Sequence, residues 1–323
     1  MNTIPTTFNQ DLPPYTILGS GKRAGTSGVT AVLLNRGGRY LRRTVFQDLE
    51  RSGFDYVLSV EEKRENYDIE ELCLRYPFLQ VLLVETGLSL GSWINLAAQE
   101  VRTSLFFVLW NDIHLYHGGR SLQGSEAMRI ADRVQKNEVL CTVPLVQNSK
   151  FESLPTLISP AYYRGTIKTL PLVPRIEGAP SLYPFDGVGI YHRDRFIQLG
   201  GFDTSLTSQF WQLMDFGFRA HLWGEEIRSS QAVRVMYDGE IPPQDTSVHP
   251  DYKRFYLKNI APVFRGDSAY LPWRRFIRYF IRSGDSIRVA HRSFREARRW
   301  VSLNGYRFRK DARLLTELWE AGS

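Results

Sequence analysis

Polar side chains follow three apolar segments of this sequence, at the point where each segment ends. They are Asn35 and Arg36, then Glu61 and Glu62, then Asn111 and Asp112. Ligands of an open parallel sheet bind outside the carboxyl ends of its strands. Carboxylate oxygens are hard ligands that suit Mg²⁺ or Mn²⁺, and arginine balances phosphate charge. If the three segments are neighbouring strands, the sequence predicts a rim that holds a diphosphate through a divalent metal.

The segments that must position this rim alternate between two patterns. Near-continuous apolar runs predict strands buried on both faces, at 29–35, 54–60, 78–85, 104–110 and 138–146. Amphipathic segments between them predict helices, at 39–53, 66–77, 91–103 and 124–137. The alternation predicts an α/β fold with a mainly parallel central sheet flanked by helices. A long surface excursion is expected from about 151 to 184, where Pro, Tyr and Gly are frequent.

The order of these segments and their polar ends resembles the nucleotide-sugar half of the family 2 glycosyltransferases of the GT-A fold. In that family the first strand typically ends in Asn-Arg, the second in two acids and the fourth in an Asp-x-Asp triplet. "FDGVGIYHRDRFIQLGGFDTSL" (185–206) is similar to the family's strand, turn and Gly-Gly-Phe-Asp acceptor loop, and "WQLMDFGFRAHLWGEEI" (211–227) to the helix that follows. The resemblance spans roughly residues 29–236 and implies a Rossmann-like, mixed, mainly parallel sheet.

Carried over residue by residue, the resemblance implies an inverting transfer from a nucleotide sugar to an acceptor hydroxyl of a glycan, lipid-linked or protein acceptor. The donor would contact Asn35, Arg36, Glu61, Glu62, Asn95, Trp110, Asn111 and Asp112. The acceptor would contact Asp186, Gly187, Gly200, Gly201, Phe202 and Asp203. A base would take the hydroxyl proton as the oxygen attacks the anomeric carbon, while a Mg²⁺ or Mn²⁺ ion stabilises the departing nucleoside diphosphate.

The Asp-x-Asp triplet departs from the family pattern. It reads Trp110-Asn111-Asp112, so Asp112 is its single carboxylate and the predicted metal ligand. Trp110 would either stack on a ring of the donor or pack as an ordinary strand residue. The family often adds a His ligand after the strand that follows the acceptor helix. Tyr237 stands near that place here, with Asp238 and His249 as substitutes, and His249 is the predicted further ligand.

The acceptor helix departs as well. Leu213 stands at the usual place of the base, and no acid lies between Asp203 and Asp215. Asp215 is therefore the predicted catalytic base, and its alternative role is a structural partner for Arg219, four residues on. In that alternative the base is Asp186, Asp203, the substrate or nothing at all. Two functions follow: an active transferase in glycan, polysaccharide or protein glycosylation, or a degenerate protein that binds a nucleotide sugar or glycan without turnover.

The net charge of +7 is carried by the end of the chain, since residues 272–323 hold 13 Lys+Arg against 5 Asp+Glu. In "PWRRFIRYFIRSGDSIRVAHRSFREARRW" (272–300), apolar residues at helical spacing are flanked by arginines. The pattern is typical of a basic amphipathic helix, which either lies on an anionic membrane surface or docks on the domain with a solvated Arg face. Nucleic-acid binding is not expected, because the arginines are not interleaved as a groove-reading motif and the remainder is near neutral.

The sequence thus predicts three parts. Residues 1–28 would form a flexible N-terminal segment and 272–323 a basic helical tail. The GT-A domain between them, 29–271, would divide into a nucleotide-sugar half (29–147) and an acceptor half (148–271). No secretory signal or membrane-spanning run is recognisable, and the two cysteines lack CxxC spacing. We expect reduced, buried thiols in a cytoplasmic protein, which would be peripheral on the inner face of the membrane if the basic tail lies on an anionic surface.

Overall fold

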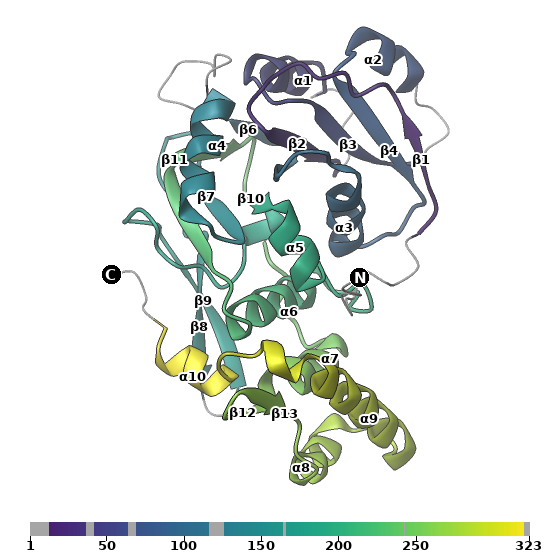
Figure 1. Cartoon of the computed structure of the whole chain (residues 1–323), viewed down its shortest axis with the longest axis vertical. Helices are drawn as coiled ribbons and strands as arrows, with labels where there is room; N and C mark the ends of the chain where they lie inside the picture. The colour runs from purple at the N-terminus through teal and green to yellow at the C-terminus, as the bar shows by residue number, and fades with distance from the viewer. Residues whose placement is uncertain are drawn as a thin grey trace.

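The protein is described by a computed structural model that covers residues 13–36, 42–63, 69–115, 126–163, 166–241 and 243–319. Within these ranges the core is a nine-stranded sheet in the order β1-β4-β3-β2-β5-β10-β7-β11-β6, flanked by helices (Figure 1). The chain then continues into a smaller helical part, drawn at the bottom of Figure 1. The α/β prediction, with a large mixed sheet and a helical C-terminal extension, is confirmed.

Four parallel strands position the predicted rim: β2 (Val29–Leu34), β3 (Val57–Glu62), β4 (Leu79–Val84) and β5 (Leu105–Trp110). Every residue of β2 and β5 is buried, as their continuous apolar character predicts. In the register, Leu34 lies opposite Val60 on one side and Trp110 on the other. The residues that follow these three positions therefore meet at one edge of the sheet.

Helices connect these strands close to the predicted places: α1 (Arg42–Arg51), α2 (Ile69–Arg75), α3 (Leu90–Glu100) and α4 (Glu126–Asn137). The start of α3 is fixed by Ser89, whose hydroxyl accepts a hydrogen bond from the Ser92 amide at 3.3 Å. That cap places α3 with its first turn toward the carboxyl end of β4, beside the rim.

The second half makes the sheet mixed. Strand β10 (Gly189–His192) runs antiparallel between β5 and β7 (Cys141–Gln147), and β11 (Ile227–Tyr237) pairs in parallel with β7. The short β6 (Ile113–Leu115) closes the edge against β11. The 3₁₀ turn η2 (Phe185–Gly187) precedes β10, and α5 (Arg193–Leu199) and α6 (Gln209–Leu222) follow it.

Two segments differ from the predictions. Residues 13–28, expected to be flexible, include β1 (Tyr15–Leu18), which pairs antiparallel with β4, while residues 1–12 lie outside the described part. The expected excursion at 151–184 contains the hairpin β8 (Leu157–Tyr163) and β9 (Thr166–Leu172). Pro160 and Pro171 obscured these strands in the sequence. A two-stranded sheet tolerates proline because each strand has a free edge.

The C-terminal part packs on the domain through shared cores. It consists of α7 (Asp251–Phe255), the π-helical turn η3 (Tyr256–Ile260), β12 (Val263–Arg265), β13 (Ser268–Tyr270), α8 (Arg274–Ser283), α9 (Ile287–Asn304), the 3₁₀ turn η4 (Gly305–Arg307) and α10 (Ala312–Glu317). Tyr279 and Phe294 pack with Leu257 and Leu271 in a second core, and Leu315 joins the main one. The predicted basic helix is thus two helices, separated at Gly284, and it is docked.

Among the described helices, none combines the length and the apolar character that crossing a bilayer requires. Both cysteines are free thiols, as expected; Cys141 is buried and Cys73 only partly so.

Candidate active site

A chain of hydrogen bonds joins the ends of the three strands at the rim. Asn111 Nδ2 donates to Asn35 Oδ1 at 2.8 Å, and Asn35 Nδ2 donates to Glu61 Oε2 at 2.7 Å. The other oxygen of Glu61 accepts the Ser59 hydroxyl at 2.7 Å. The parallel register brings these side chains together, and the hydrogen bonds from Asn35 and Ser59 hold the Glu61 carboxylate in place. Glu62, the next residue, accepts a longer hydrogen bond from the Gly87 amide at 3.3 Å.

Arg36 places a cation at the centre of the rim. Its backbone amide donates to Asn111 Oδ1 at 3.1 Å, and its guanidinium forms an ion pair with Asp186. The guanidinium also lies 3.6 Å from Asp112 Oδ2 and 4.0 Å from the centre of the Trp110 ring. The side chain is 24% exposed. A guanidinium held by two carboxylates and an indole, with one side still open, suits recognition of a phosphate group.

Trp110 packs as a strand residue. Its ring is buried, meets the Trp93 ring edge to face at 6.0 Å and donates from Nε1 to the carbonyl oxygen of Asp186 at 3.0 Å. Arg36 lies over the indole. The sequence left two roles open for Trp110, stacking on a ring of the donor or packing as a strand residue. In this conformation Trp110 packs, and stacking on a donor ring would require Arg36 to move.

Asp112 lies just beyond the carboxyl end of β5, and its side chain is 32% exposed. Among the described residues, its Oδ1 is buried and has no hydrogen-bond partner. The backbone carbonyl of Asp112 accepts the Asp238 amide at 2.9 Å, and Asp238 in turn pairs with His114 at 2.5 Å. Nowhere in the described part do three His, Cys, Asp or Glu side chains gather as a metal site. Mg²⁺ needs no such cage, since one carboxylate, waters and substrate phosphates are enough.

His249 is engaged elsewhere. Its Nδ1 accepts the Asp251 amide at 3.2 Å, at the start of α7, and lies 3.2 Å from the Asp251 carboxylate. The Asp251 carboxylate also accepts the amides of Thr207 and Ser208, ahead of α6. These contacts give His249 a place in the junction between α6 and α7, and they do not bring it to Asp112.

Asp186 links the donor rim to the second half of the domain. Its backbone is in the left-handed region, with φ 57° and ψ 18°, which is strained for a residue other than glycine. Its carboxylate accepts the Tyr237 hydroxyl at 2.9 Å and Gln209 Nε2 at 2.8 Å, besides the pair with Arg36. Burial raises the pKa of Asp186 above the usual range, and the Arg36 charge and the hydrogen bonds offset only part of that.

The Gly-Gly-Phe-Asp loop is clamped by Asn95. The side chain of Asn95 donates a hydrogen bond from Nδ2 to the Phe202 carbonyl oxygen and accepts one at Oδ1 from the Phe202 backbone N–H, both at 2.9 Å. Gly200 and Gly201 have φ of 91° and 59°, which only glycine adopts without strain. Asn95, predicted to contact the donor, holds the acceptor loop in this structure, and Phe202 is itself buried in the core.

Asp203 and Asp215 form a buried ion cluster with Lys258. The Lys258 ammonium lies 2.7 Å from Asp203 Oδ2 and 2.9 Å from Asp215 Oδ1. Arg254 adds a contact of 2.9 Å to Asp203, and Arg219 one of 3.1 Å to Asp215. Burial alone would raise the pKa of both carboxyls, but these cations outweigh it and hold both below the usual range.

This environment bears directly on the predicted base. Asp215 is 0% exposed, and its two oxygens accept from Lys258, Asn259 and Arg219. Arg219 also donates to the carbonyl oxygens of Leu199 and Gly201, at 2.7 and 2.6 Å. The geometry favours the structural alternative for Asp215: the cluster anchors the acceptor loop to α6 and η3.

Several residues of the site escaped the sequence reading. Lys258 is 43 positions from Asp215 but is 1% exposed beside it. Gln212 donates to Ser89 Oγ at 2.7 Å and accepts the Gly91 amide at 3.0 Å, so it ties α6 to the start of α3. Gln209 donates to Asp186, and so does Tyr237, whose position the sequence had marked but whose contact with Asp186 it had not. The one available signal was a lysine inside an apolar stretch, "FYLKNIAPVF" (255–264).

No protein-family model and no curated protein matches the sequence. Solved structures are similar in fold. The crystal structure of GalNAc-T7 with UDP, GalNAc and Mn²⁺ matches with a TM-score of 0.54 and 14% sequence identity. The match covers 91% of this chain and 58% of the GalNAc-T7 chain. The crystal structure of S. aureus TarS 1–349 in complex with UDP-GlcNAc has a TM-score of 0.49 and 12% identity, over 83% of this chain and 71% of that one. The described chain thus has the GT-A fold.

Proposed function

We propose that the protein is a glycosyltransferase that moves a sugar from a nucleotide-sugar donor to an acceptor hydroxyl with inversion. The observation that carries the proposal is Arg36, held between Asp112 and Asp186 where the donor rim meets the second half of the domain. GalNAc-T7, which shares the fold, was crystallised with UDP and Mn²⁺. The rim of this chain offers the charges that a nucleoside diphosphate needs.

In this proposal each part of the rim has a separate task. Glu61, fixed by Asn35 and Ser59, accepts hydrogen bonds from the ribose or base of the donor. Arg36 binds the diphosphate, and Asn111 positions Arg36 through its backbone amide. Glu62 lies beside Glu61 at the end of β3 and completes the acidic side of the donor site.

Asp112, whose side chain is 32% exposed, would hold a divalent metal through its carboxylate, with the remaining ligands from the diphosphate and water. Such an ion would supply charge stabilisation for the leaving nucleoside diphosphate. Asp238 lies next to Asp112, but its carboxylate is engaged with His114. We therefore keep Asp112 as the metal residue and do not retain His249.

We assign the base to Asp186. Of the three buried acids among the described residues of the second half, Asp203 and Asp215 are each paired with Lys258 and an arginine, whereas Asp186 pairs with Arg36 and adjoins the donor rim. Its raised pKa lies closer to the range in which a carboxylate accepts a proton at neutral pH. Gln209 and Tyr237 orient the carboxylate toward Arg36, so Asp186 would take the acceptor proton next to the charge that binds the donor.

The alternative is a protein that binds a nucleotide sugar or glycan without turnover, which the single carboxylate of the triplet favours. Release of UDP from UDP-sugars in the presence of Mn²⁺, with and without a panel of glycan acceptors, separates the two. Turnover that depends on Asp112 and Asp186 supports the transferase. Tight binding of UDP with no turnover for any donor and acceptor pair would support the binding protein instead.

A further inference from the structure

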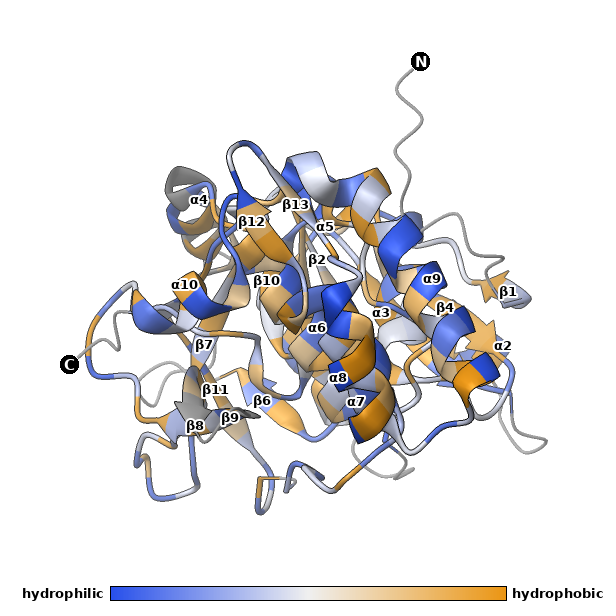
Figure 2. Cartoon of the chain, turned by 90° about the horizontal axis from the view of Figure 1, so that it is seen from below, coloured by the Kyte–Doolittle hydropathy of each residue, from blue (hydrophilic) through white to orange (hydrophobic). Residues whose placement is uncertain are grey.

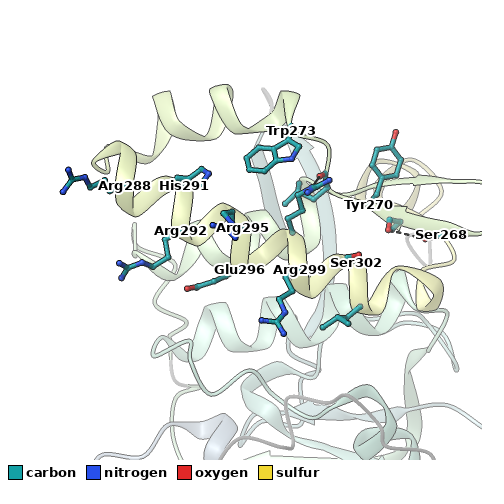
Figure 3. Close-up of a pocket in the computed structure, with 14 residues that line it drawn as sticks. Ser268, Tyr270, Trp273, Arg288, His291, Arg292, Arg295, Glu296, Arg299 and Ser302 are labelled. Carbon is teal, nitrogen blue, oxygen red and sulfur yellow. Dashed lines mark hydrogen bonds between the residues drawn. The ribbon is translucent and has the colours of Figure 1, made fainter.

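The C-terminal part contains a basic pocket, far richer in cations than the rim. A cavity of about 980 Å³ lies between α9 and the segment from β13 to α8 (Figure 3). Five arginines of α9 line it, against one acid, Glu296: they are Arg288, Arg292, Arg295, Arg298 and Arg299. Tyr270 and Trp273 line the same pocket from the opposite segment.

Helical spacing explains why the arginines gather. Positions 288, 292, 295 and 299 recur every three or four residues and so share one face of α9. The opposite face carries Ala290, Phe294 and Val301, which are buried in the second core. Arg298 is held by a hydrogen bond to the Leu271 carbonyl at 3.3 Å and lies 5.2 Å from the Trp273 ring. Like charges at this spacing repel one another, and an anion in the pocket would relieve that repulsion.

Exposed isoleucines lie on α8 and α9, close in the chain to two residues of this pocket: Ile277 is four positions after Trp273, and Ile287 directly precedes Arg288. Ile277 and Ile281, one turn apart on α8, are 65% and 73% exposed, and Ile287, the first residue of α9, is 61% exposed. Arginines flank them at 274, 278, 282 and 288, and Figure 2 displays this alternation of hydrophobic and hydrophilic residues along α8. Large aliphatic side chains in water beside cations are typical of a helix that lies in the interface of an anionic bilayer.

We infer that α8 and α9 form a peripheral membrane site, in which Ile277, Ile281 and Ile287 enter the bilayer interface and the arginine pocket binds the phosphate of an anionic lipid headgroup. Both parts are needed: the isoleucines supply apolar burial without charge selectivity, and the arginines supply selectivity for anionic lipids. The helices remain docked on the domain, because Tyr279 and Phe294 keep their place in the second core. The inference is independent of the proposed transferase activity.

Co-sedimentation of the full-length protein with vesicles tests the inference. We expect binding to vesicles of phosphatidylcholine with phosphatidylglycerol at 0.1 M salt, little binding to phosphatidylcholine alone, and release at 0.5 M salt as the charges are screened. The double variant Arg292→Gln/Arg295→Gln should weaken binding at least about tenfold, since each basic residue contributes near an anionic surface. Ile277→Ser/Ile281→Ser should weaken it by a similar factor. These side chains are exposed, so both variants should keep the wild-type melting temperature.

The control variant removes two arginines of the same tail outside the pocket, Arg309→Gln/Arg313→Gln. Arg313 is exposed on α10 and pairs with Glu317 at 2.8 Å. This variant should bind vesicles within about twofold of wild type if the pocket matters. Equal losses in the control and pocket variants would reduce the site to non-specific charge and overturn the inference.

Inorganic polyphosphate separates a lipid ligand from a soluble one. If the wild type binds polyphosphate, needs the pocket arginines to do so, and fails to sediment with anionic vesicles, the pocket serves a soluble phosphate ligand and the membrane inference is wrong. Unchanged vesicle binding by Ile277→Ser/Ile281→Ser would contradict it as well. Loss of vesicle binding in both the isoleucine and the pocket variants, with the control intact, supports it.

Discussion

The donor rim and the buried ion cluster use the same residue types in opposite surroundings. At the rim, Arg36 lies between Asp112 and Asp186, remains partly exposed and leaves one oxygen of Asp112 without a partner. In the cluster, Lys258 lies between Asp203 and Asp215, is 1% exposed, and both carboxylates are further bound by arginines. The same arrangement of a cation between two acids can therefore serve either ligand binding or the stability of the fold. The two groups differ in the exposure of the cation, which is 24% for the Arg36 side chain and 1% for Lys258.

The largest effect is expected from breaking the cluster. Lys258→Met removes the cation shared by Asp203 and Asp215, and a buried ion group that loses one partner is destabilised by about 3–5 kcal/mol. Urea denaturation should measure that loss in the free energy of unfolding. The matched control is Lys253→Met, because Lys253 is partly exposed and pairs with Asp285 at 2.6 Å. That surface pair should be worth at most about 1 kcal/mol. Equal losses for the two variants would remove the distinction.

Replacing Asp186 or Asp215 with asparagine compares the two regions through their effect on turnover. Asp186→Asn keeps the shape of the side chain but cannot take a proton, so turnover should fall at least about a hundredfold while UDP binding persists. Asp215→Asn should leave turnover per folded molecule within about threefold and lower the melting temperature. The assay is UDP release, corrected for the folded fraction by circular dichroism. The reverse pattern would return the base to Asp215.

Asn95 tests whether the acceptor loop depends on its clamp. Asn95→Ala leaves the Phe202 amide and carbonyl buried without their partner, which should lower the free energy of unfolding by about 1–3 kcal/mol. If Asn95 instead contacted the donor, the variant would weaken UDP binding and keep its stability. Chemical denaturation and UDP titration on the same preparation distinguish the two outcomes.

The smallest expected effect is a difference in pH dependence: the cluster should affect the pH dependence of stability, and Asp186 that of turnover. The lowered pKa values of Asp203 and Asp215 stabilise the fold above the usual aspartate range, and that stabilisation is lost as the pH falls through the range below about 4. Asp215→Asn should flatten part of this acid limb in thermal melts. Asp186 has a raised pKa, so turnover should rise with pH through a value above the usual aspartate range. A turnover limb that vanishes in Asp215→Asn but persists in Asp186→Asn contradicts the assignment.

The sequence predicted what local pattern controls. Apolar runs located β2, β3, β4 and β5, and the parallel register then made neighbours of Asn35, Glu61 and Asn111. It could not predict contacts between distant segments. Lys258 beside Asp215 and Gln212 beside Gly91 depend on how α6 packs against η3 and α3. The partners of Asp215 were hidden from the sequence for the same reason, because Lys258 and Asn259 lie more than 40 residues later in the chain.

UDP binding to the rim tests the central claim most directly. Isothermal titration with UDP in the presence of Mn²⁺ should give a single site in the wild-type protein, and Asp112→Asn should weaken binding at least about tenfold by removing the metal carboxylate. Arg36→Gln should weaken it with or without Mn²⁺, because it binds the phosphates themselves. Asp194→Asn, an exposed acid on α5, serves as the control and should bind like wild type. UDP affinity that is the same in the Asp112, Arg36 and Asp194 variants would contradict a nucleotide site at this rim.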